Sequence, residues 1–300
     1  MQLVAIDALT GLRAALKASK TKRAAVFEEQ VVDPLRLFWE PFLGVMPGAK
    51  DHQDDHPALA AAKTFNFFTP NLDVAEGLLA LDRLEEAGTW EESVATIERA
   101  WSALAPEDHD IDLREVSFTL VLGNPQKLET QGGYTGFGGM PGLVLILAWP
   151  TDDNLAKLPA AGAHELHHNI RFSFEPFHPV ETTVGQYIVA EGLAEAFAVE
   201  ICGTDKLGPW ASALSADQIA AVRPRFQKAL EVKGLSHIRG YVFGDWAAEK
   251  SGYEPVGLPD FAGYVIGYEV ARAYMERSGK SAAETTYIPW RAIVEESGYF

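Results

Sequence analysis

The sequence is poor in cysteine and in positive charge. Its 300 residues include one cysteine, Cys202, which has no second cysteine in the chain for a disulfide. Because a chain without disulfides suits a reducing compartment, we expect a cytoplasmic protein. Lys and Arg number 25 against 42 Asp and Glu, which gives a formal net charge of −17. A field of this sign repels phosphate backbones and anionic lipid surfaces, so we expect neither nucleic acid nor a membrane as partner.

Long apolar runs are missing too. No stretch reaches the roughly 18 apolar residues that a membrane span needs. The first residues, MQLVAIDALTGLRAALKASKTKR, lack a basic region followed by an apolar segment and a cleavage site. Both absences favour a soluble, cytoplasmic protein. Hydrophobic residues still make up 47% of the chain, which is ample for a packed core.

The first third of the sequence has helical periodicity. Apolar residues recur at helical spacing from residue 3 to residue 18. Thr89 and Glu92 fit a capping box at the start of another helix. The segments predicted to be helical here are 3–18, 24–43 with breaks at its prolines, 72–86 and 89–104. We therefore expect residues 1–110 to form a helical N-terminal region.

The segment DHQDDHP at 51–57 carries two histidines four residues apart, among acidic neighbours. A second metal site is one interpretation of this spacing. No apolar periodicity supports a helix there, so a solvated acidic loop is the preferred interpretation.

The pattern changes at residue 115. EVSFTLVL at 115–122 and GLVLILAW at 142–149 are apolar and partly β-branched, which predicts two strands. Between them lies GGYTGFGGMPG, whose glycines match no phosphate-loop spacing. We expect a glycine-rich turn or strand close to a cleft, where its backbone could meet an extended peptide.

Residues 161–172 read AGAHELHHNIRF and contain the motif H-E-x-x-H. His164 and His168 are four residues apart, so on a helix they share a face and can bind one zinc ion. Glu165 is placed to take the proton of a metal-bound water. His167 points about 100° away from the ligand face, so we expect it to pack or to form a hydrogen bond.

A later helix, predicted from about 183 to 201, offers a third ligand. Glu191 and Glu195 are four residues apart in a small and apolar segment, where an uncompensated carboxylate is costly to bury. We predict that Glu191 completes the zinc site, since Gly192 beside it lets two helices approach closely. Glu195 is predicted to accept a hydrogen bond from the free ring N–H of His164. Ordinary surface glutamates on a half-exposed helix face are the alternative.

The rest of the chain predicts helices. They are a helix beginning at the capping box Ser215-x-x-Gln218 and interrupted at Pro224, and helices over 262–277 and 288–297. We expect an α+β fold, predominantly helical, with a small sheet packed on the H-E-x-x-H helix. Residues 111–300 are expected to form the core with its C-terminal helices, as one continuous unit with residues 1–110.

H-E-x-x-H followed by a helix bearing E-G-x-A-E resembles the gluzincin clan of zinc peptidases, in which the glutamate before the glycine is the third ligand. The motifs HELHHNIR, AEGLAEAFA, GYVIGYEVARAY and the closing EESGYF are, in this order, similar to those of the YjaZ-type family of candidate zinc-dependent proteases. This resemblance covers roughly the last two thirds of the chain. It implies zinc and a zincin-like peptidase fold, without implying a substrate.

A zinc peptidase also needs a donor for the oxyanion that forms during hydrolysis. Tyr264 and Tyr268 share a predicted helix face and are the preferred candidates, with His237 and Arg239 as the alternative pair. Tyrosine rings packed in a helix interface would explain the same pattern without a catalytic role. Arg171, one turn after the motif, is predicted to pair with Glu191, Glu195 or another buried acid.

Two hypotheses of function follow. In the first, the chain is a zinc metallopeptidase (a hydrolase) with one Zn²⁺, held by His164, His168 and Glu191, and acts on a peptide or protein substrate. The metal lowers the pKa of its water toward about 7, Glu165 takes the proton, and the hydroxide attacks a peptide carbonyl. In the second, the chain is a non-catalytic, zinc-stabilised binding or regulatory protein on a peptidase fold.

A third interpretation is that H-E-x-x-H occurs by chance in an ordinary helix. The presence of Glu191 and Glu195 argues against this interpretation. The sequence leaves substrate specificity, endo- or exopeptidase action and oligomeric state open.

Overall fold

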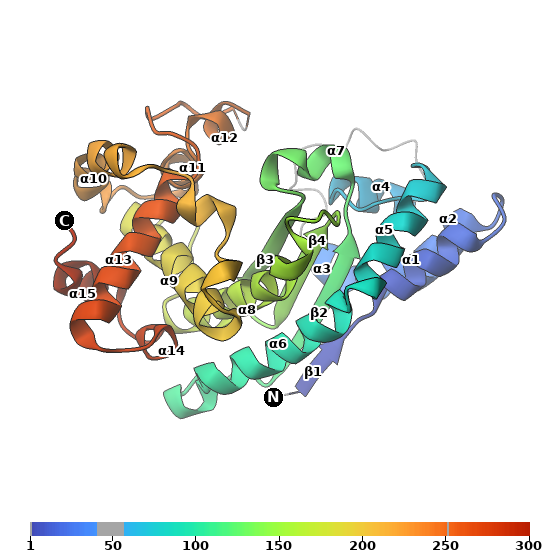
Figure 1. Cartoon of the computed structure of the whole chain (residues 1–300), viewed down its shortest axis with the longest axis horizontal. Coiled ribbons are helices and arrows are strands. Elements are labelled where there is room, and N and C mark those ends of the chain that lie inside the picture. The colour runs from blue at the N-terminus through green and yellow to red at the C-terminus, as the bar shows by residue number, and fades with distance from the viewer. Residues whose placement is uncertain (1, 41–56, 251) are drawn as a thin grey trace. The chain divides into compact units, whose positions relative to one another are not determined.

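The computed structural model describes residues 2–40, 57–250 and 252–300 (Figure 1). The chain divides into two units, which are described separately. Unit 1 consists of residues 1–95, 114–137 and 142–162, and unit 2 of residues 96–113, 138–141 and 163–300. Residues 51–56 of the predicted acidic loop lie outside the described residues.

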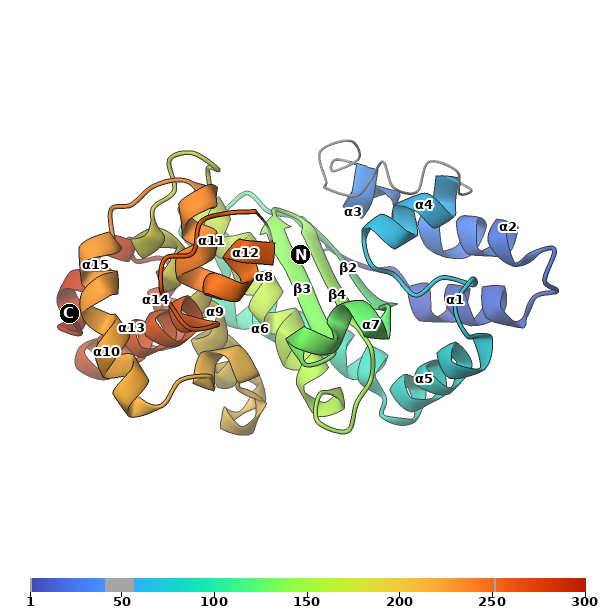
Figure 2. The same cartoon turned by 90° about the horizontal axis from the view of Figure 1, so that it is seen from above.

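A four-stranded sheet has the strand order β1-β2-β4-β3, and Figure 2 shows β2, β4 and β3 side by side. β1 pairs with β2 and β2 with β4, both in parallel. Only Pro141 and Gly142 separate β3 from β4, and a connection this short reverses the chain direction. The side chains of β2 are buried from its second residue to its last, as expected for a strand with neighbours on both sides. The strands are β1 (Gln2–Ala5), β2 (Glu115–Leu122), β3 (Tyr134–Met140) and β4 (Leu143–Ala148).

Short helices accompany the strands in unit 1. Asp7 caps the first of them, because its side chain accepts a hydrogen bond from the backbone N–H of Thr10 at 2.9 Å. The helices are α1 (Ala8–Lys17), α2 (Arg23–Phe27), α3 (Arg36–Trp39), α4 (Pro57–Thr64), α5 (Val74–Glu86) and α7 (Pro125–Leu128). A π-helical turn, Glu28–Val32, follows α2.

Two predictions for the N-terminal region are wrong. Gln2–Ala5 form strand β1 instead of the start of a helix, because these residues pair with β2, a partner far along the chain that apolar spacing cannot reveal. Thr89 is the first residue of α6 and not its cap. The Thr89 hydroxyl has no hydrogen-bond partner within the described parts of the chain, so the predicted capping box is not formed.

Unit 2 is mainly helical. Residues of both units occur in β3, in α6 (Thr89–Leu104) and in α8 (Leu158–Phe174). The remaining helices are α9 (Val184–Cys202), α10 (Ala216–Ala229), α11 (Leu235–Phe243), α12 (Asp245–Lys250), α13 (Ala262–Ser278), α14 (Ala282–Thr285) and α15 (Trp290–Ser297). The predicted capping box of α10 is formed by Ser215 and Gln218, but the predicted interruption at Pro224 is wrong, since α10 continues through it.

α9 and α13 lie side by side (Figure 1), and their backbones touch where two glycines meet. A Cβ atom on Gly192 would lie 2.0 Å from the carbonyl carbon of Gly267, and one on Gly267 would lie 1.9 Å from the carbonyl oxygen of Ile188. Only glycine permits this approach. The contact brings the two helices that carry Glu191 and Tyr264 together.

β3 approaches α8 just as closely within unit 2. A Cβ on Gly138 would lie 2.0 Å from the carbonyl oxygen of Glu165. The side-chain amide of Asn169 donates to the carbonyl of Gly138 at 2.7 Å. The predicted fold class, α+β and predominantly helical with a small sheet, is therefore confirmed. No helix within residues 2–40, 57–250 and 252–300 has the length and apolar character that crossing a membrane requires.

Candidate metal centre

α8 and α9 bring three donor atoms together in unit 2. The Nε2 atoms of His164 and His168 lie 3.0 Å apart, and Oε2 of Glu191 lies 3.3 Å from each. All three side chains are buried. Tetrahedral zinc, with bonds of about 2.0–2.1 Å, holds its ligand atoms roughly 3.3 Å apart. Both the spacing and the two-nitrogen, one-oxygen donor set therefore fit zinc.

The charges of this trio are complementary. Burial works against a charged His164, but Glu191 and Glu195 outweigh burial and raise the pKa of its imidazole well above the ordinary value. Burial works against a charged Glu191 as well, yet His168 and His164 lower the pKa of its carboxyl to about 2. Glu191 is thus an anion throughout the physiological pH range, as a carboxylate that binds a cation must be.

Glu165 lies beside the trio and is half-buried. Burial raises the pKa of its carboxyl, and Glu191 and Glu195 raise it further, while the two histidines oppose the increase. A carboxylate with a raised pKa accepts a proton from water more readily near neutral pH. The position and the pKa both suit a general base.

Glu195 makes contacts on three sides. Its Oε1 lies 3.0 Å from Nδ1 of His164, which is ion-pair distance although the ring N–H is poorly directed for a hydrogen bond. The same carboxylate accepts hydrogen bonds from the backbone N–H of Gly208, at 3.1 Å, and from the indole N–H of Trp210. These two donors come from the loop after α9. Nothing local in the sequence marks them, and they were not predicted.

The structure distinguishes the two predicted tyrosines. Burial and the nearby Glu191 raise the pKa of the Tyr264 phenol well above its ordinary value, with further contributions from Glu165 and Glu195. Tyr268 is half-buried, and the guanidinium of Arg272 lies 5.8 Å from the centre of its ring. Of the two tyrosines, Tyr264 is therefore the one that Glu191 and Glu165 affect electrostatically.

Three half-buried rings surround Tyr264. The centroids of Trp210, Phe243 and Phe261 lie 6.0, 5.8 and 6.2 Å from the centroid of the Tyr264 ring. Phe261 has a left-handed backbone conformation, with φ of 62°. These packing contacts restrict the movement of the tyrosine ring.

A third tyrosine, Tyr187, was not predicted. It lies one turn before Glu191 on α9, and burial together with the nearby Glu191 raises the pKa of its phenol well above the ordinary value. The i,i+4 spacing that pairs Glu191 with Glu195 also relates Tyr187 to Glu191, so this signal was present in the sequence. Of the alternative donors, His237 is exposed, whereas Arg239 is half-buried and close enough to affect Tyr187 electrostatically.

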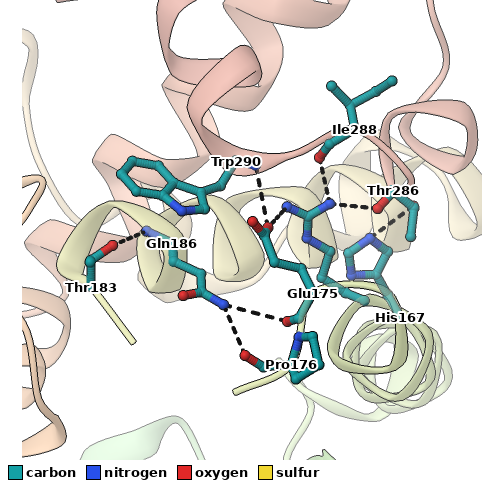
Figure 3. A network of polar contacts seen from close by, with 9 residues as sticks. His167, Glu175, Pro176, Thr183, Gln186, Thr286, Ile288 and Trp290 are labelled. Carbon is teal, nitrogen blue, oxygen red and sulfur yellow. Dashed lines mark hydrogen bonds and ion pairs between the residues drawn. The ribbon is translucent and has the colours of Figure 1, made fainter. Parts of the chain in front are cut away.

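A second face of α8 carries His167 (Figure 3). Its Nε2 lies 3.0 Å from the hydroxyl of Thr286, which donates its own proton to the carbonyl of Ala282. The imidazole is therefore the donor to Thr286. Burial lowers the pKa of His167 well below its ordinary value and keeps the ring neutral. The predicted hydrogen-bonding role of His167 is confirmed.

Arg171 lies on the same face and is almost fully buried. It donates to the carbonyls of Thr286 and Ile288, at 2.6 and 2.7 Å, and pairs with Glu175. The acid that pairs with Arg171 is thus Glu175 and not a glutamate of the metal cluster. Glu175 also accepts from the backbone N–H of Trp290 at 3.3 Å (Figure 3). This network ties the C-terminal segment to α8.

Comparison with known sequences places the chain in a family. It belongs to the family described as "Predicted Zn-dependent protease (DUF2268)", whose profile matches residues 89–295. The predicted resemblance over the last two thirds of the chain is confirmed by this match.

Two relatives come from Bacillus subtilis (strain 168). The uncharacterized protein YjfC is 33% identical over 279 residues, which cover 93% of this chain and 92% of YjfC. The uncharacterized protein YjaZ is 25% identical over 165 residues, which cover 53% of this chain and 59% of YjaZ. No solved structure gives a significant match.

Proposed function

We propose that the chain is a zinc-dependent metallopeptidase that hydrolyses peptide bonds with Glu165 as general base. The observation that carries the proposal is the buried trio of His164, His168 and Glu191, with donor atoms 3.0–3.3 Å apart, beside a half-buried Glu165. One zinc ion bound there would supply a Lewis acid that polarises the peptide carbonyl and activates water.

Glu165 would move the proton. Its carboxylate takes a proton from the attacking water and later passes it to the nitrogen of the leaving amine. Burial raises the pKa of Glu165, which makes both the uptake and the return of the proton feasible near neutral pH. Tyr264, whose phenol stays protonated because its pKa is also raised, would donate a hydrogen bond to the oxyanion.

The proposed substrate is a peptide or protein bound in extended form. β3 is the edge strand in the order of the described sheet, and Gly138 holds the strand against the backbone of Glu165. An edge strand at this position can hydrogen-bond an extended peptide through its main chain. The single cysteine and the net charge of −17 support a cytoplasmic location and argue against a nucleic-acid partner.

The presence of Glu165 favours the peptidase hypothesis over the hypothesis of a non-catalytic, zinc-stabilised protein. Burying a carboxylate whose pKa is raised costs stability, and a purely structural metal site needs no such group. A catalytic role for the Glu165 carboxylate would explain why the protein tolerates this loss of stability.

The test is the Glu165→Gln variant, loaded with zinc and assayed on a denatured-protein substrate. We expect one zinc per chain in wild type and variant, with hydrolysis reduced about 10²–10⁴-fold in the variant. Glu276→Gln, a matched change at an exposed position of α13, should leave both quantities unchanged. Full activity of Glu165→Gln would contradict the proposal.

A further inference from the structure

Trp210 lies in the segment 203–215, which connects α9 to α10 and is called the α9–α10 loop below. Its indole N–H, which can only donate, makes a hydrogen bond to Oε1 of Glu195. That oxygen also lies 3.0 Å from Nδ1 of His164, and Nε2 of the same imidazole lies 3.3 Å from Oε2 of Glu191. A continuous series of polar contacts therefore runs from Trp210 to two of the candidate metal ligands.

The same loop binds the second oxygen of this carboxylate. The backbone N–H of Gly208 donates to Oε2 of Glu195 at 3.1 Å. A Cβ atom at position 208 would lie 2.6 Å from Nε1 of Trp210 and 2.9 Å from Oε1 of Glu195, so a residue with a side chain would displace the indole or the carboxylate. The loop thus supplies a donor to each oxygen of a carboxylate that is only 2% exposed.

Packing fixes the direction in which the indole N–H points. The ring centroid of Trp210 lies 6.0 Å from that of Tyr264 on α13, and Phe243 and Phe261 pack around the same tyrosine. The 3₁₀ turn that contains the indole, Pro209–Ser212, packs against α13 as well. The hydrogen bond to Glu195 therefore depends on the contact between the loop and α13.

These contacts bear on metal binding through one imidazole. An acceptor beside the second ring nitrogen of a ligand histidine fixes the tautomer and orientation of the ring and makes the ligating nitrogen more basic. Glu195 has this place beside His164. A buried carboxylate keeps its charge and its direction only where donors compensate its burial, and Trp210 supplies one of them.

We propose that Trp210 and Gly208 position the carboxylate of Glu195, and that the α9–α10 loop and metal binding are thereby coupled. This inference rests on the zinc site of the proposed function and adds two positioning residues to it. Coupling of this kind is reciprocal, so the factor by which the loop strengthens zinc binding is the factor by which zinc stabilises the contacts of the loop.

The first experiment measures the zinc affinity of the full chain by competition with a chromophoric chelator. Trp210→Phe keeps an aromatic ring against α13 and removes the N–H donor. Zinc affinity should fall about tenfold, at the lower end of the usual effect of changing an outer partner of a metal ligand. The control is Trp246→Phe, the same change at an exposed position of α12, which should stay within about twofold of wild type.

A double-mutant cycle tests whether Trp210 acts through Glu195. In a Glu195→Ala background the carboxylate is gone, so adding Trp210→Phe should change zinc affinity by less than about twofold. A purely structural role of the indole would instead lower the thermal midpoint and leave the zinc affinity of the folded variant unchanged. Circular dichroism and the thermal midpoint of each variant identify a loss that comes from misfolding.

The second experiment measures the reciprocal effect by amide hydrogen exchange with and without zinc. In wild type, the Gly208 amide should exchange about tenfold more slowly when zinc is bound, because the carboxylate that accepts its hydrogen bond is then better held. Trp210→Phe should reduce this difference. The control is the amide of Gly279, which donates to the Met275 carbonyl at the end of α13 and should exchange equally in both states.

Three results would overturn the inference. They are an unchanged zinc affinity in Trp210→Phe, the same loss from this substitution with and without the Glu195 carboxylate, and equal exchange of the Gly208 amide with and without zinc. Failure of the peptidase proposal is recognised separately, because neither experiment uses hydrolysis. A wild type that binds zinc with these couplings and cleaves no peptide refutes the peptidase alone, and a wild type that binds no zinc refutes both.

Discussion

The two faces of α8 carry the same residue type in opposite settings. The Nε2 atoms of His164 and His168 each lie 3.3 Å from Oε2 of Glu191. The carboxylates of Glu191 and Glu195 raise the pKa of His164. His167, on the other face, meets the Thr286 hydroxyl, and burial lowers its pKa. A single helix therefore presents a candidate metal-binding face and a structural face. The partners from other elements, and not the imidazole itself, decide which role each histidine has.

The largest expected effect is on the metal face. His168→Ala removes one of three protein ligands, so we expect zinc affinity to fall by about 10³-fold or more. Competition with a chromophoric chelator measures this loss. His167→Ala, the neighbouring histidine, should bind zinc within a few-fold of wild type. An equal loss of zinc affinity in His168→Ala and His167→Ala would contradict the assignment of different roles to the two faces.

The second-largest effect is expected from removing the guanidinium of Arg171, which lies on the structural face. Arg171→Met leaves the carbonyls of Thr286 and Ile288 and the carboxylate of Glu175 without their donor. We expect the free energy of unfolding to fall by about 3 kcal/mol, as measured by urea denaturation. Zinc stoichiometry of the folded variant should remain one per chain. A loss below about 1 kcal/mol would show that the network contributes little.

A smaller effect is expected at the second carboxylate of α9. Glu195→Gln keeps one acceptor oxygen, so it can accept from only one of Gly208 and Trp210, and it removes the negative charge beside Nδ1 of His164. Zinc affinity should fall about 10–100-fold, the usual effect of losing an outer partner of a ligand histidine. Glu175→Gln is the matched change on the structural face. It should leave zinc affinity unchanged and lower only the stability.

The smallest effect concerns pH. Because burial lowers the pKa of His167 in the folded state, the unfolded chain binds a proton below pH of about 6.5 that the folded chain does not. Folding stability should therefore decrease as the pH falls below that value, by up to about 1.4 kcal/mol per pH unit from this group. His167→Gln should flatten the dependence between about pH 6.5 and 5. Urea denaturation of both proteins across this range measures it, and parallel curves would refute the assignment.

Local spacing was enough to identify the donors of the candidate site. His164 and His168, like Glu191 and Glu195, are related by the i,i+4 rule, which depends only on the geometry of one helix. Tyr187 obeys the same rule and was identifiable in principle. The fold class was predictable for a similar reason, since helical periodicity and apolar strands are local patterns.

Features that depend on distant segments were not predictable. Gly208 and Trp210 reach Glu195 through a loop whose course depends on the packing around it. Strand β1 exists because Gln2–Ala5 find β2 as a partner, while the same residues taken alone have helical spacing. The continuity of α10 through Pro224 is a third case, in which surrounding structure outweighs local propensity.

The glycine contact between α9 and α13 has a consequence for the variability of the site. Glu191 is the neighbour of Gly192, and Tyr264 lies one turn before Gly267, so the spacing between the candidate ligand Glu191 and the proposed donor Tyr264 is set where two backbones touch. No side chain mediates that spacing, and none can be exchanged to adjust it. Even the smallest replacement, alanine, would force the helices apart at this point. Random mutagenesis of the two glycines should accordingly recover almost no active clones.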